Sequence, residues 1–150
     1  MKKLIIKSYI ENLTSVRESV AEWLNKLPLS NKHKANLEFC VIEAVINAIK
    51  HGNVKNPENL VVIEFEQSRE GFVVSVSDSG QGFDPKTIGD PRDAMRLVSP
   101  TGRGIFFMRQ MMNDVVFEFK SEGTTVRLFW KYQFSSGCNI ISTQCRAAGC

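Results

Sequence analysis

Apolar residues recur along this chain with two different periods, which predict a mixture of helices and strands. A first helix is expected from an Asn12 or Thr14 cap to just before Pro28. Its apolar positions, which pack on the sheet or against a second subunit, are Leu13, Val16, Val20, Trp23, Leu24 and Leu27. A second helix is expected from a Ser30 or Asn31 cap to about 51–52, and a third over about 105–112.

Alternating apolar and polar residues predict strands between these helices. The expected strands cover residues 4–10 at an edge, 60–67, 72–78, 115–119 and 124–132. In the third of these, Phe72, Val74, Val76 and Asp78 share the apolar face, which should lie against the helices. The pattern predicts an α+β fold, a two-layer sandwich in which helices cover one face of a mainly antiparallel sheet.

The composition is consistent with the predicted fold and limits the kinds of protein that this chain can be. With 43% hydrophobic and 23% charged residues, the 150-residue chain is typical of a soluble globular protein. The net charge of +3 is scattered, which argues against a nucleic-acid surface, and no apolar run is long enough to span a membrane. The apolar stretch after the two N-terminal lysines ends too early for a signal peptide, so we expect a cytoplasmic protein. Residues 1–132 are expected to form one domain, with Cys40 in its core and a mobile tail over 133–150.

The second helix carries a polar pair in an otherwise apolar run. Glu43 and Asn47 are four residues apart, which places them one turn apart on the same face. A carboxylate there is costly unless something pairs with it. An acid and an amide together suggest a metal ion, a substrate proton or both, because an amide oxygen suits Mg²⁺ and a carboxylate can act as a general base. A buried, mutually satisfied structural pair remains the alternative.

Two glycine-containing motifs follow. In DSGQGFDP, Gly80 and Gly82 permit a close backbone approach, and Asp78 can accept a hydrogen bond from the amine of adenine. In TGRGIFFM, Gly102 and Gly104 precede a helix whose free N–H groups can bind a triphosphate. Neither motif is a dinucleotide fingerprint or a P-loop.

In this order and at these separations, the three motifs resemble the N, G1 and G2 boxes of the GHKL ATP-binding superfamily, with its Bergerat fold. Members of that superfamily include gyrase, Hsp90, histidine kinases and MutL. The resemblance is closest to the small anti-sigma-factor serine/threonine kinases of the SpoIIAB and RsbW type, and it covers about residues 4–132.

The resemblance implies a role for each matching residue. Glu43 matches the catalytic acid, Asn47 the Mg²⁺ ligand and Asp78 the adenine-binding carboxylate. Gly80 and Gly82 match residues that shape the pocket, and Gly102 and Gly104 match the lid hinge and phosphate contacts. Arg103 either reaches a phosphate oxygen or is solvated. His51 matches a structural residue. The loop over 84–101 would fold over the triphosphate.

The implied function is an ATP- and Mg²⁺-dependent serine/threonine protein kinase that acts as an anti-sigma factor. Such a protein binds a sigma factor and phosphorylates a serine on a STAS-domain anti-anti-sigma protein. The resemblance also implies a homodimer. A nucleotide-gated binding module without physiological kinase activity is the alternative, because it would need the same residues. The catalytic domain of a histidine kinase is disfavoured, because we find no preceding helix with a phospho-accepting histidine.

Overall fold

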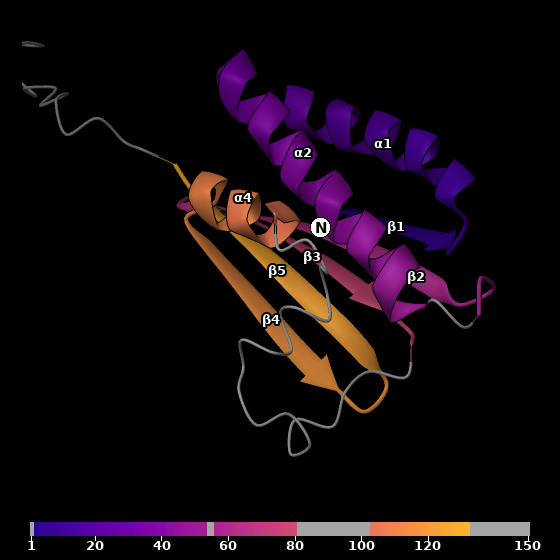
Figure 1. The fold of residues 1–150 in the computed structure, drawn as a ribbon. Coiled ribbons are helices and arrows are strands. Elements are labelled where there is room, and N and C mark those ends of the chain that lie inside the picture. The colour runs from indigo at the N-terminus through magenta and orange to yellow at the C-terminus, as the bar shows by residue number, and fades with distance from the viewer. Residues whose placement is uncertain (1, 54–55, 81–102, 133–150) are drawn as a thin grey trace, which may run out of the picture.

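The fold consists of one sheet and one layer of helices, as seen in a computed structural model that describes residues 2–53, 56–80 and 103–132 (Figure 1). In chain order the elements are β1 (Lys2–Lys7), the 3₁₀ turn η1 (Ile10–Asn12), α1 (Leu13–Asn25), α2 (Asn31–Asn47), the π turn η2 (Ala48–Gly52), β2 (Leu60–Gln67), β3 (Gly71–Asp78), α4 (Arg103–Met111), β4 (Asp114–Lys120) and β5 (Gly123–Lys131). No helix among these described residues is long and apolar enough to cross a membrane.

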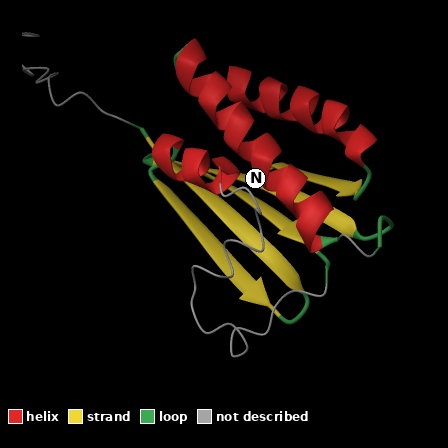
Figure 2. Cartoon of the chain, in the orientation of Figure 1, coloured by secondary structure: helices red, strands yellow, loops and turns green. Residues whose placement is uncertain are grey.

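The five strands form a single sheet in the order β1-β2-β3-β5-β4, and every neighbouring pair is antiparallel. Helices α1, α2 and α4 all lie on the same face of this sheet (Figure 2). In Figure 1, α4 lies beside α2 although they are far apart in the sequence. The predicted α+β two-layer sandwich is therefore confirmed, with β1 at an edge as expected.

The core lies between the helices and the sheet. The alternating residues Val61, Ile63 and Phe65 of β2 are buried, and the ring of Phe65 lies 4.6 Å from that of Trp23 on α1. The apolar face of α1 therefore packs on the sheet of its own chain. Cys40 is buried in this core, where burial and then the nearby Glu43 carboxylate raise the pKa of the thiol to about 12. Its expected place in the core is confirmed.

Two local predictions near the N-terminus are wrong. The first strand ends at Lys7 rather than Ile10, because the N–H of Ser8 bonds to the carbonyls of Pro57 and Asn59 instead of continuing the ladder. Neither expected side-chain cap forms on α1, because a 3₁₀ turn leads into this helix and the Asn12 amide donates to the carbonyl of Lys7. The expected Ser30 cap of α2 is confirmed, since its hydroxyl accepts from the N–H of His33.

Candidate functional site

The polar pair of α2 lies where this helix meets α4. Asn47 is 6% exposed, and its Nδ2 has no hydrogen-bond partner within the described part of the chain. Glu43 is half-buried, and its carboxylate faces the start of α4, because a Cβ placed on Gly104 would lie 2.6 Å from Glu43 Oε2. The structure thus brings residues of two predicted motifs into contact. Within the described residues Asn47 Nδ2 therefore does not bond to the Glu43 carboxylate, which argues against a mutually satisfied pair.

A π turn ends this helix and carries it to the edge of the site. The N–H of Asn53 donates to the carbonyl of Ala48, five residues earlier, at 2.9 Å. Single π turns of this kind occur frequently at functional sites. Here the turn places Gly52 directly against Asp78 of β3. Burial, and secondarily the charge of Lys50, lowers the pKa of His51 in the same turn, which favours its neutral form.

Asp78 is held in a tight backbone cradle at the end of β3. The side chain is 9% exposed, and its Oδ1 accepts hydrogen bonds from the N–H groups of Gly80 at 3.0 Å and Thr124 at 3.2 Å. A Cβ on Gly52 would lie 2.2 Å from the carboxylate carbon, so only glycine fits there. On the other side, Gly123 has a φ of 115° and lies against the carbonyl of Asp78. Both of these bonds go to Oδ1 and neither engages Oδ2, which could accept from a ligand.

Burial makes the ionised form of Asp78 costly. It raises the pKa of this carboxyl above its ordinary value of 3.8, and the backbone N–H groups of Gly80, Thr124 and Asp78 itself only partly offset this effect. The folded state therefore binds a proton more readily than the unfolded state. The cost to stability is present in full above the folded pKa and disappears as the pH falls below the unfolded value.

Replacing Asp78 by Asn should therefore stabilise the nucleotide-free protein at neutral pH. The amide oxygen can keep both backbone bonds while the buried charge is removed. The gain in the free energy of unfolding should shrink as the pH falls from about 7 to about 4, because the wild-type carboxyl becomes protonated in the folded state. Urea unfolding of both proteins across this range measures the difference. A D78N protein that is less stable by the same amount at every pH would refute the burial cost.

A small cavity lies between the end of α2 and the sheet. Its volume is about 20 Å³, with room for about one water molecule, so a purine could enter only if the surrounding groups moved apart. The residues around it are Ala44, Asn47, Ala48, His51, Gly52, Val76, Asp78, Thr124 and Val126. The Asn47 amide of the first predicted motif and the Asp78 carboxylate of the second therefore line the same cavity.

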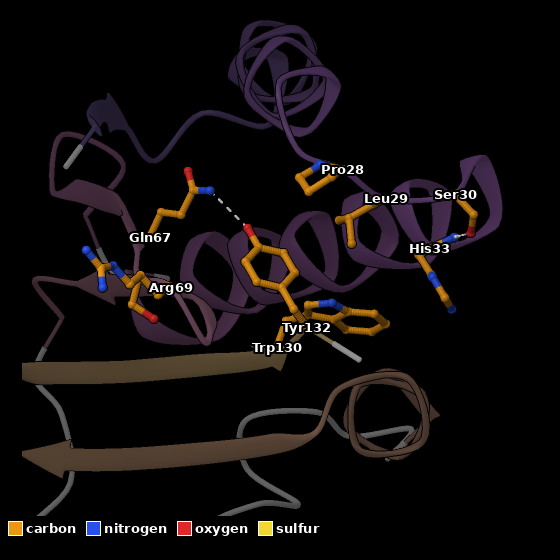
Figure 3. Close-up of a pocket in the computed structure, with 9 residues that line it drawn as sticks. Pro28, Leu29, Ser30, His33, Gln67, Arg69, Trp130 and Tyr132 are labelled. Atoms are coloured by element: carbon orange, nitrogen blue, oxygen red, sulfur yellow. Dashed lines mark hydrogen bonds between the residues drawn. The ribbon is translucent and has the colours of Figure 1, made fainter. Parts of the chain in front are cut away.

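A larger hollow lies at the opposite end of the sheet. It has a volume of about 550 Å³, and its walls include Pro28, His33, Gln67, Trp130 and Tyr132 (Figure 3). The Gln67 amide donates to the Tyr132 hydroxyl across one wall. None of the predicted site residues that the structure describes lines this hollow. Size alone therefore does not identify the site, and we place the candidate site where the polar groups converge.

Of the predicted site residues, the structure brings together Glu43, Asn47, Asp78, Gly80 and Gly104 at one end of the molecule. Gly82, Gly102 and the expected lid over 84–101 lie outside the described residues, and Arg103 is the first residue of α4. Sequence reasoning missed the parts played by Gly52, Gly123 and Thr124. The first two carried a signal, because a glycine follows His51 and another opens the last strand.

The fold is that of the histidine kinase-like, or GHKL, ATPase class: a five-stranded antiparallel sheet with helices on one face. Glu43, Asn47 and the glycines around Asp78 lie together at one end of this sheet. The family model of the histidine kinase-like ATPase domain matches residues 6–130, and the chain belongs to this family. The family implies ATP binding.

Two curated relatives are 28% and 29% identical to this chain. The chain is 28% identical to the serine-protein kinase RsbW of Listeria innocua over 72% of this chain and 74% of that protein. It is 29% identical to the anti-sigma F factor of Bacillus cytotoxicus over 86% and 91%, respectively. In a crystal structure of the RsbU and RsbW domains of a Mycobacterium tuberculosis protein, the matched region has a TM-score of 0.61 at 19% identity. It covers 87% of this chain but 32% of that one, so this likeness supports the fold alone.

Proposed function

We propose that the chain is a Mg²⁺- and ATP-dependent serine protein kinase with an anti-sigma role. The observation that carries this proposal is the contact between Glu43 and Gly104, which joins an acid on α2 to the start of α4. In a phosphoryl-transfer site, the group that receives the proton must lie beside the groups that hold the phosphates. The names of the relatives, a serine-protein kinase and an anti-sigma factor, support the same activity.

Each side chain has a separate task in this proposal. Asp78 Oδ2 accepts a hydrogen bond from the exocyclic amine of adenine. Guanine has a carbonyl at the equivalent position, which cannot donate a hydrogen bond. Glu43 orients the serine hydroxyl of the substrate and accepts its proton as the hydroxyl attacks the γ-phosphate. Gly104 keeps α4 close enough for Glu43 to lie at the start of that helix, where free N–H groups favour phosphate.

Asn47 fits the requirements of a Mg²⁺ ligand. Its amide is buried, and its Nδ2 has no partner among residues 2–53, 56–80 and 103–132. The oxygen and nitrogen of such an amide can exchange places by a flip. A single amide oxygen suits Mg²⁺, which keeps most of its waters and shares phosphate oxygens. When bound, the ion would offset the charge on the phosphates. Among the described residues no cluster of three or more acidic, histidine or cysteine side chains could hold a metal by itself.

The partners in this proposal are a sigma factor and a STAS-domain anti-anti-sigma protein. We further propose that the kinase domain covers residues 1–132, that the protein is cytoplasmic and that it forms a homodimer. The experiment is an affinity purification in Mg²⁺-ATP with γ-labelled nucleotide, followed by phosphosite mapping of the co-purified proteins. Label on a serine of a STAS-domain protein supports the kinase. Stable, nucleotide-dependent capture of that protein without label would instead indicate a nucleotide-gated binding module.

Replacing Gly104 by Ala should slow phosphoryl transfer and leave the fold intact. The added methyl would lie 2.6 Å from Glu43 Oε2, and the flexible glutamate can relieve this clash only by turning its carboxylate away. Misplacement of a reacting group by about 1 Å can cost about 100-fold in rate. Single-turnover transfer and thermal unfolding of the G104A protein measure both effects. Transfer at the wild-type rate would mean that the position of Glu43 is unimportant.

A further inference from the structure

One buried amide, at the end of the motif that carries Glu43 and Asn47, has no part in the proposed chemistry. Asn53 is 2% exposed, and its Nδ2 donates to the Ser8 hydroxyl at 2.6 Å and to the Leu60 carbonyl at 3.0 Å. Its backbone N–H closes the π turn on Ala48. Its Oδ1 is buried without a partner among the described residues. An unpartnered buried polar atom carries a cost, so a residue with this arrangement needs an explanation beyond packing.

The backbone next to Asn53 forms one wall around Asp78. Gly52 lies against the carboxylate, and a Cβ on Gly80 would lie 1.9 Å from the Gly52 carbonyl oxygen. Gly52 therefore lies in contact with both Asp78 and Gly80 of the DSGQGFDP motif. Because Asn53 is the next residue, any shift of its anchored amide moves Gly52 and with it the space available to Asp78.

The residue that follows Asp78 is tied to the same carbonyl. The Ser79 hydroxyl donates to the Leu60 carbonyl at 3.3 Å, which is the acceptor that Asn53 also uses. The Asn59 amide in turn donates to the Ser79 carbonyl at 3.0 Å. One carbonyl at the start of β2 thus connects Asn53, which follows Gly52, with Ser79, which follows Asp78.

We propose that Asn53 is a positioning residue for base recognition: its amide, through the Leu60 carbonyl, fixes Gly52 and so the direction in which the Asp78 carboxylate meets the adenine amine. This inference rests on the proposed function, because it assumes that Asp78 binds adenine. It predicts that loss of the Asn53 amide weakens discrimination between bases, beyond any effect on stability.

The test compares the dissociation constants of ATP and ITP, whose base carries a carbonyl in place of the adenine amine. Wild-type protein should bind ATP at least about tenfold more tightly than ITP. In Asn53→Leu, which has a similar size but no donor, this ratio should fall to about threefold or less. Calorimetry with each nucleotide and Mg²⁺ gives both constants. A loss of folded protein weakens the apparent binding of both nucleotides equally and leaves their ratio unchanged.

The matched control is Val20→Ala, a fully buried core position on α1 that takes no part in this hydrogen-bond network. It should lower stability and keep the wild-type ratio. If N53L does not fold, Asn53→Asp serves instead, because it keeps the shape and places an acceptor against the Leu60 carbonyl. An unchanged ratio in the folded Asn53 variant would overturn the positioning role. Wild-type protein that binds both nucleotides equally would overturn adenine recognition by Asp78, and the positioning role with it.

Discussion

Replacing Glu43 by Gln is expected to lower the rate of phosphoryl transfer by about 10²- to 10⁴-fold, the usual contribution of a general base. Glutamine keeps the length and shape of the side chain, so its contact with Gly104 and the packing of α2 against α4 should persist. The amide cannot accept the proton of an attacking hydroxyl. Single-turnover transfer of label to the protein substrate at saturating Mg²⁺-ATP measures the loss directly.

The control for this variant is ATP binding, which should survive in E43Q because Glu43 has no role in holding the base. A matched substitution on the same helix is Glu38→Gln. Glu38 pairs with Arg17 of α1 at 3.0 Å, and the loss of this charge should leave transfer unchanged. Transfer by E43Q at the rate of E38Q would remove Glu43 from the chemistry, because another group would then accept the proton.

Replacing Asp78 by Asn is expected to weaken ATP binding by about 10- to 100-fold, the loss of one hydrogen bond to a charged acceptor. The amide oxygen would keep the bonds from Gly80 and Thr124, so the amide nitrogen would face the ligand. A donor would then meet the donor amine of adenine. The carbonyl of ITP would meet the same nitrogen favourably, so D78N should lose the preference for ATP.

Two results together distinguish this loss from unfolding. The D78N protein should bind ATP less tightly and, without nucleotide, resist urea better than wild type at neutral pH, because the buried charge has been removed. Opposite changes in affinity and stability are expected of a group retained for binding rather than for folding. Wild-type affinity for ATP in D78N would place the adenine elsewhere.

Local patterns predicted much of the fold. The alternation of β2 fixed both its limits and its buried face, because a one-residue shift would have exposed Val61, Ile63 and Phe65. Likewise, the apolar face of β3 predicted that Asp78 would end on the helix side. The placement of Glu43 and Asn47 one helical turn apart on the same face could be predicted without any tertiary information, because it depends only on their spacing in the sequence.

The features that sequence reasoning missed depend on distant contacts. The end of β1 is set by carbonyls of Pro57 and Asn59, and no local signal near Ser8 indicates them. The π turn that brings Gly52 to Asp78 looks in the sequence like an ordinary helix end. The cradle of glycines around one carboxylate is visible only once residues from three parts of the chain lie together.

The most direct test of the central claim is a crystal structure of the protein with Mg²⁺ and a non-hydrolysable ATP analogue. We expect the adenine amine within hydrogen-bond distance of Asp78 Oδ2, Mg²⁺ bound by the side-chain oxygen of Asn47, and the γ-phosphate on the side of Glu43. A nucleotide bound in the groove of Figure 3, or one that contacts neither Asp78 nor Asn47, would contradict it.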